Sequence, residues 1–164
     1  MLLFNRRSFL TMCMLPVVAA CGFTPVYGPG GSAENIRGKI ALQAATDKNT
    51  FALVGRLENR LGVASNANYR LSYTLTTSSE AFSIKGSTDT ERFQVVGELN
   101  FQLTEIDNNT IVNSGAVNSF TSYSTTGSTV GTLSAELDAK DRLMVILADL
   151  LVDRLLVTSA DWAQ

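Results

Sequence analysis

The sequence contains no histidine and only two cysteines among its 164 residues. Without histidine, the chain cannot form serine–histidine or cysteine–histidine nucleophile pairs, histidine zinc sites or the usual general base near neutral pH. Paired carboxylates could still run a glycosidase-type reaction, but the acidic residues mostly sit at helix-surface spacing or beside turns. We therefore expect a protein that is not an enzyme, and nothing in the sequence has the pattern of a cofactor or metal site.

The second cysteine, Cys21, directly follows two alanines at the end of an apolar stretch that begins at Phe9. Arg6 and Arg7 give this segment a positive start, and it is too short to cross a bilayer as a permanent helix. Residues 1–20 are therefore predicted to be a secretory signal peptide. A cysteine immediately after the cleavage point is typical of bacterial lipoproteins, so we expect Cys21 to be acylated as the mature N-terminus.

The export route has two interpretations. The run from Asn5 to Leu10, with its adjacent arginines, also fits a twin-arginine signal, which addresses folded proteins for export. The same two arginines could simply supply the positive start of an ordinary signal peptide. In either case Cys13 leaves with the signal, and the mature chain cannot form an intramolecular disulfide.

The mature chain divides into a tether and one domain. Residues 21–33 contain two prolines and four glycines, a composition that disfavours helix and strand and suits a flexible tether. Residues 34–164 have a length that fits one hydrophobic core. Removal of the signal leaves 11 basic and 15 acidic side chains, so a broad nucleic-acid-binding surface is not expected.

Positive charge is concentrated early in this domain. Residues 35–70 hold six basic and two acidic side chains, whereas residues 71–164 hold five basic and twelve acidic. Such asymmetry has two explanations, a contact face for an anionic ligand or ordinary solvated charge on the outside of helices and strands.

Two helices and four strands are predicted from periodicity. Apolar residues alternate from Ile36 to Leu42 and predict a first strand with one polar face. A helix over residues 50–61 is indicated by Asp47 or Asn49 as N-cap and by Gly62 as the stop. Leu133 to Val157 carry an apolar stripe at helical spacing and predict a long second helix.

The middle of the chain is predicted to be β structure. Residues 69–76 alternate, a bulge or turn is expected over residues 77–80, and residues 85–89 are predicted to form a hairpin tip. Residues 93–103 and 111–123 form two further strands joined by a turn at residues 107–109, the last strand with a polar outer face. The predicted fold is α+β, in the order β-α-β-β-β-α, with a four-stranded sheet that carries both helices on one face.

The stretch Cys21-Gly22-Phe23-Thr24-Pro25-Val26-Tyr27-Gly28 resembles the opening of mature lipopolysaccharide-assembly lipoproteins of the LptE family. The order of elements and the mature length are also similar to that family. The resemblance implies a lipoprotein at the periplasmic face of the outer membrane, which plugs the β-barrel protein LptD, helps that barrel to assemble and takes part in lipopolysaccharide transport. Gly22 after the cysteine is consistent with sorting to the outer membrane.

The resemblance also implies that basic residues near the sheet contact lipopolysaccharide, whose phosphates call for arginine or lysine donors. Five basic residues are candidates on the predicted strands and hairpin: Arg37, Lys39, Arg70, Lys85 and Arg92. No motif selects among them, and plain surface charge is the alternative for each.

Two other functions remain open at the level of sequence. A periplasmic auxiliary lipoprotein of an ABC-type lipid transporter would also be small, tethered and α+β. An envelope hydrolase that acts through carboxylates would need an acidic pair in a cleft, with Glu98 and Glu105 among the candidates.

Overall fold

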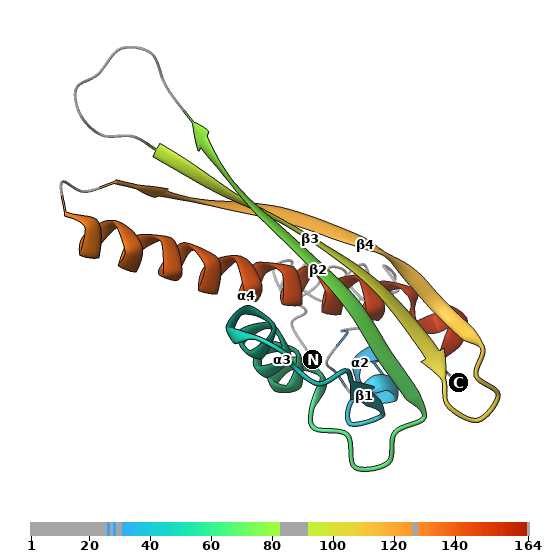
Figure 1. The fold of residues 1–164 in the computed structure, drawn as a ribbon. Helices are drawn as coiled ribbons and strands as arrows, with labels where there is room; N and C mark the ends of the chain where they lie inside the picture. The colour runs from blue at the N-terminus through green and yellow to red at the C-terminus, as the bar shows by residue number, and fades with distance from the viewer. Residues whose placement is uncertain (1–25, 27, 29–30, 83–91, 126–127, 164) are drawn as a thin grey trace, which may run out of the picture.

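The computed structural model describes residues 26, 28, 31–82, 92–125 and 128–163. These residues form a four-stranded sheet in the order β1-β2-β3-β4, together with three helices. In Figure 1 the long helix α4 runs along one face of the sheet, and α3 and α2 lie beside it. The predicted α+β fold with a four-stranded sheet is confirmed. The predicted signal peptide of residues 1–20, the predicted acylation site Cys21 and the predicted hairpin tip lie outside the described residues.

The beginning of the domain differs from the prediction. Ser32–Ile36 form a short helix, α2, and only Ile40–Leu42 form strand β1, so the prediction that the first strand begins at Ile36 was wrong. Ile36 is 1% exposed because it packs from the helix into the core. Its spacing from Ile40 fits a strand and a helix equally well, so alternation alone could not distinguish them. Gly38, at φ +71, makes the turn between the two elements.

Helix α3, Lys48–Leu61, follows the predicted signals. Asp47 is the N-cap: its carboxylate accepts from the Thr50 N–H at 3.0 Å, and Thr50 Oγ1 accepts from the Asp47 N–H at 3.0 Å. This reciprocal capping box satisfies N–H groups at the helix start and settles the choice between Asp47 and Asn49. Gly62, at φ +80, ends the helix in a conformation that favours glycine.

The three long strands each have 14 residues: β2 spans Tyr69–Phe82, β3 spans Arg92–Glu105 and β4 spans Ile111–Ser124. β1 pairs with β2 in parallel, and the other pairs are antiparallel. Pairing of β2 with β3 continues without a shift from Tyr69 to Phe82, so the bulge predicted over residues 77–80 was wrong. The irregularity instead falls in the β3–β4 ladder, between Leu103 and Thr104.

Helix α4, Thr129–Trp162, is longer at both ends than predicted. Ser128 caps its start, where its hydroxyl accepts from the Gly131 N–H at 3.4 Å. At the other end Trp162 makes an edge contact with the Tyr69 ring, and its main-chain oxygen accepts from the Tyr69 hydroxyl at 3.0 Å. The last turns are thus held by contacts with β2.

The core lies between the helices and one face of the sheet. It is made of fully buried apolar side chains from α3, β2, β3 and α4, including Leu57, Leu71, Leu99, Leu147 and Leu151, whereas β4 contributes only partly buried ones such as Val117. Gly97 allows α4 to approach β3 closely, since a Cβ at this position would come within 2.9 Å of Leu147 Cδ1. The opposite face of the sheet carries no helix among the described residues.

Candidate functional site on the open face of the sheet

The face of the sheet that points away from the helices is called the open face below. Strand residues alternate between the two faces, so every second side chain of β2, β3 and β4 points to the open face. Thr74, Asn100, Gln102, Ser114 and Asn118 are among these, and all are exposed. The open face is therefore rich in hydroxyl and amide groups, but on β4 it also carries Phe120, which is 60% exposed, so the predicted polar outer face of the last strand is confirmed in part.

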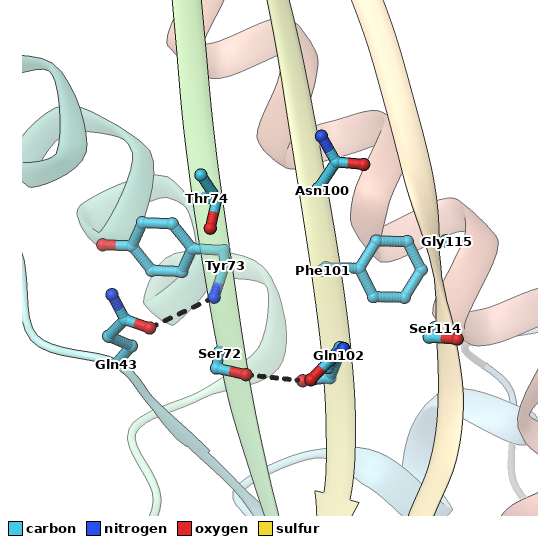
Figure 2. A pocket seen from close by; sticks show the side chains of 9 residues that line it. All are labelled: Gln43, Ser72, Tyr73, Thr74, Asn100, Phe101, Gln102, Ser114 and Gly115. Carbon is cyan, nitrogen blue, oxygen red and sulfur yellow. Dashed lines mark hydrogen bonds between the residues drawn. The ribbon is translucent and has the colours of Figure 1, made fainter.

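A shallow hollow of about 440 Å³ lies on the open face near β1 (Figure 2). Gln43 closes one side of it, where the Gln43 Oε1 atom accepts from the Tyr73 N–H at 3.2 Å. Ser72 Oγ donates to the main-chain oxygen of Gln102 at 3.4 Å across the β2–β3 ladder. The hollow is lined by Gln43, Ser72, Tyr73, Thr74, Asn100, Phe101, Gln102, Ser114 and Gly115.

The lining of the hollow defines the chemistry it can support. None of the side chains that line it is charged near neutral pH, and Tyr73 and Phe101 are 8% and 2% exposed because they belong to the buried face. Hydroxyls and amides can each donate and accept hydrogen bonds. The hollow is suited to a ligand or protein surface that offers uncharged polar groups.

Three of the five basic candidates lie at the β1 end of the sheet, with Arg37 on the helix side and Arg70 on the open face. Arg37 is exposed just after α2, and its Cγ lies over Gly62. Lys39 directly precedes β1, and its main-chain oxygen accepts from the Asn68 N–H at 2.9 Å. Arg70 is exposed on the open face opposite Ala41. We call Arg37, Lys39 and Arg70 the proximal group.

Arg92 lies far from the proximal group. It begins β3, where it is exposed and pairs with Phe82 and Ser124. Phe82 is 12 residues from Arg70 along β2, which at about 3.3 Å per residue corresponds to about 40 Å. One small ligand therefore cannot contact both Arg70 and Arg92. Lys85, predicted to flank the same hairpin as Arg92, lies outside the described residues.

Half of the basic residues between positions 35 and 70 form ion pairs within the fold. Arg56 donates two hydrogen bonds of 2.9 Å to Asp149, and Arg60 Nη1 donates to the same carboxylate at 2.7 Å. These hydrogen bonds hold the pKa of Asp149 below its ordinary value, and the bonding from Arg56 has the largest effect. Lys48 pairs with Asp141 at 3.6 Å. Three of the six basic residues of this segment thus join α3 to acidic residues of α4, which the sequence could not reveal without the packing of the two helices.

The carboxylates Glu98 and Glu105 do not form a pair. Glu98 is on the open face and accepts from Asn100 Nδ2 at 2.9 Å, whereas Glu105 ends β3 and accepts from Asn108 Nδ2 at 2.7 Å. They are seven residues apart along one strand, so their side chains point to opposite faces, about 23 Å apart. The two carboxyl groups of a glycosidase active site lie within about 10 Å of each other.

In the part of the chain that the structure describes, no three histidine, cysteine, aspartate or glutamate side chains are grouped closely enough to hold a metal ion. None of the described helices, α4 included, combines the length and apolar character that a bilayer span requires.

The fold is shared with several bacterial lipoprotein structures. One is assigned as a lipoprotein of Caulobacter crescentus CB15, with a TM-score of 0.66 and 17% identity over 79% of this chain and 95% of that protein. Rare lipoprotein B of Shewanella oneidensis has a TM-score of 0.57 and 11% identity over 77% of this chain and 98% of that protein. A minor lipoprotein of Acinetobacter baumannii has a TM-score of 0.52 and 16% identity, over 73% and 91%.

No curated protein matches the chain in sequence. The family model described as lipopolysaccharide-assembly, LptE, matches residues 38–155, which is more than half of the chain and extends from just before β1 to the last third of α4. The resemblance seen at Cys21–Gly28 is therefore supported by an independent match to the folded domain, and this chain belongs to the LptE family of lipopolysaccharide-assembly lipoproteins.

Proposed function

We propose that this protein is an outer-membrane lipoprotein, anchored at the periplasmic face through acyl chains on Cys21. It assists the assembly of an LptD-type β-barrel, plugs that barrel and takes part in lipopolysaccharide transport to the cell surface, without catalysing a reaction. The observation that carries the proposal is the LptE family match over residues 38–155. The lipoprotein motif at Ala19-Ala20-Cys21-Gly22 supplies the anchor.

The open face supports a role inside a barrel. The barrel interior of outer-membrane proteins is polar, so a plug needs a polar surface that can form hydrogen bonds without burying unpaired charge. The hydroxyls and amides around the hollow have this character. A hydrophobic open face would instead suit a lipid-facing position.

Lipopolysaccharide contact is assigned to the basic residues at the hairpin end. Arg92 is exposed there, Lys85 lies seven positions earlier in the sequence, and both can donate hydrogen bonds to lipid A phosphates. The double variant Lys85→Gln, Arg92→Gln should weaken binding of purified lipopolysaccharide about tenfold or more and leave the thermal transition unchanged. Arg37→Gln with Lys39→Gln, which removes equal charge from the proximal group, is the control. Equal loss in both double variants would reject the hairpin assignment.

The partner is tested by capture of the full-length lipoprotein from detergent extracts of the native host. The proposal predicts that a large β-barrel protein co-purifies. Recovery of an inner-membrane permease complex would instead favour the auxiliary lipoprotein of an ABC-type lipid transporter. Cys21→Ser should release the chain from membranes without changing its thermal transition, because durable anchoring needs two or more acyl chains. Persistent membrane association of that variant in cells without the barrel would contradict the anchor.

A further inference from the structure

Strand β4 forms one edge of the sheet, and no described strand lies beyond it. From Ile111 to Ser124 it contains no charged residue and no proline. Natural proteins usually protect an edge strand with charges, prolines, bulges or short length, because its unpaired N–H and C=O groups can bind another strand. At the other edge β1 covers the start of β2, and the uncovered part of β2 carries Glu80. The β4 edge is therefore the one open to strand addition.

The register shows which backbone groups of β4 are free. In β2, the Tyr69 N–H donates to the main-chain oxygen of Lys39 at 3.1 Å, so the odd-numbered residues of β2 face β1. Because this facing alternates through the two antiparallel ladders, the even-numbered residues of β4 direct their N–H and C=O groups to the free edge. The side chains of its odd-numbered residues lie on the helix side of the sheet.

A row of α4 side chains lies beside this edge. Arg142 Nη2 donates to the main-chain oxygen of Ser122 at 3.3 Å, and a Cβ at Gly115 would come within 2.9 Å of Arg154 Nη2. The two apolar residues between these arginines are 37% and 39% exposed. Steps of four residues keep the row on one side of the helix. We call this row and the free side of β4 the β4–α4 edge; the row consists of Arg142, Ile146, Leu150 and Arg154.

Positive charge marks both ends of the row. Arg154 is exposed, lies 5.9 Å from the centre of the Phe101 ring and forms no ion pair with a described residue. Arg142 pairs with Asp138 at 3.0 Å, but a guanidinium has five N–H donors and can bind a second carboxylate. A second copy placed on this edge around a two-fold axis would bring Arg142 against Arg154. The charges therefore favour a different chain that carries carboxylates.

The spacing of the row matches that of an added strand. Four residues of helix advance about 6 Å, and two residues of strand advance about 6.6 Å. The two arginines are thus about 18 Å apart along the helix axis, and three steps of two residues along a strand cover about 20 Å. The row ends beside Ser122 and Gly115 of β4. Alternate side chains of an added strand would therefore meet successive members of the row.

We propose that the β4–α4 edge binds an extended segment of another protein, which adds to β4 as an antiparallel strand. The segment carries two acidic residues six positions apart, with apolar residues at the second and fourth positions after the first. The acidic residues bind Arg142 and Arg154, and the apolar residues pack on Ile146 and Leu150. Main-chain hydrogen bonds supply affinity and this pattern supplies specificity. The inference does not rest on the proposed function.

The direction of the segment follows from the fold. β4 runs opposite to α4, since Ser122 lies beside Arg142 and the earlier Gly115 lies beside Arg154. A strand antiparallel to β4 therefore runs in the direction of α4. Its first acidic residue meets Arg142, and its second meets Arg154.

Peptide binding tests the pattern. The probe is a synthetic peptide of alternating threonine and valine with glutamates six positions apart, and its affinity for the full-length protein in detergent is measured by fluorescence anisotropy. Lysine in place of both glutamates should weaken binding at least about tenfold, because like charges would meet at both arginines. Deletion of one threonine should also weaken it, because one glutamate then points to the open face. No binding, or equal binding of the three peptides, would overturn the proposal.

Charge reversal tests the assigned contacts. Arg154→Glu should weaken binding of the glutamate peptide at least about tenfold, and lysine at the second acidic position alone should restore it. Arg70→Glu, at an exposed residue of the open face, is the matched control and should leave binding unchanged. If Arg154→Glu does not fold, Arg142→Glu and lysine at the first acidic position form the corresponding pair. Failure of the lysine peptide to restore binding in a folded variant, or an equal loss in Arg70→Glu, would contradict the assignment.

Amide hydrogen exchange tests strand addition itself. The glutamate peptide should slow exchange at least about tenfold at the N–H groups of Ala116, Asn118 and Phe120, which face the free edge. The odd-numbered amides of β4, already bonded to β3, should change little. Slowed exchange confined to another element would overturn the proposal. So would a stable dimer in light scattering of the peptide-free protein, because a second copy would then occupy the edge.

Discussion

The two faces of the sheet differ in what they contact. The buried face contributes Leu71, Leu99 and Leu103, each fully buried against the helices. The open face, on the same strands, presents Thr74, Asn100 and other uncharged polar groups to solvent. Since adjacent residues of one strand serve these different roles, substitutions one position apart should have very different effects. Stability is expected to depend on the buried face and partner binding on the open face.

Leu147→Ala should produce the largest loss of stability. Leu147 is 0% exposed and lies on α4 against Gly97, so truncation removes buried area and leaves a cavity. The free energy of unfolding should fall by about 2–5 kcal/mol, as measured by chemical denaturation. Thr76→Ala, on the open face, should change it by less than about 0.5 kcal/mol. Comparable losses from the two would remove the distinction between the faces.

A pair of glycine substitutions tests the close approach of α4 to the sheet. Gly97→Ala should lower the free energy of unfolding by about 1–3 kcal/mol, because its Cβ would come 2.9 Å from Leu147 Cδ1 and 3.0 Å from Leu143 Cδ2. Gly55→Ala, on the exposed side of α3 with no atom within 4 Å, should raise it by about 0.5–1 kcal/mol. Thermal and urea unfolding report both signs. Stabilisation by Gly97→Ala would contradict the packing described.

The link between α3 and α4 predicts a pH dependence. Asp149 is half-buried between Arg56 and Arg60, and Asp149→Asn should cost about 1–2 kcal/mol near neutral pH. Because the hydrogen bonds lower the pKa of Asp149 in the folded state, its contribution is present above the ordinary aspartate pKa of about 4 and is lost as the pH falls through the folded value. The stability difference between the parent and variant should narrow in acid. If the stability difference between the parent and Asp149→Asn does not change with pH, the loss of stability does not come from the charge of Asp149.

Tyr73→Phe should have the smallest effect. The Tyr73 hydroxyl is buried and has no hydrogen-bond partner among the described residues, so burial raises its pKa and the hydroxyl costs desolvation without compensation. The free energy of unfolding should stay within about 0.5 kcal/mol of the parent value. Chemical denaturation of the parent protein and of Tyr73→Phe measures this difference. A loss of unfolding free energy well above about 0.5 kcal/mol would indicate that the Tyr73 hydroxyl forms a hydrogen bond.

The sequence predicted those elements whose signals are local. Asp47 and Gly62 bound α3 because a capping box and a positive φ depend on a few adjacent residues. The prediction of a bulge over residues 77–80 was wrong because β2 stays in register with β3, wherever its apolar residues fall. The short helix at Ser32–Ile36 was missed because its five residues are too few to show a helical period.

The candidate site was less accessible to sequence reasoning. Polar alternation predicted the outer face of β4, but the hollow also requires Gln43, which reaches the site only because β1 pairs beside β2. Five basic candidates could be named, yet the separation of Arg92 from Arg70 depends on strand register. The pairing of Arg56 with Asp149 joins residues 93 positions apart and follows only from the packing of α3 on α4.

The central proposal is a lipid anchor at Cys21, which would give the folded domain its place in the envelope. The direct measurement is mass spectrometry of the N-terminal tryptic peptide, which ends at Arg37, from protein purified from the native host. We predict a peptide that begins at Cys21 and carries the mass of a diacylglycerol group and an N-terminal acyl chain. A peptide with a free Cys21 thiol, or a mature chain that begins at another residue, would contradict the account.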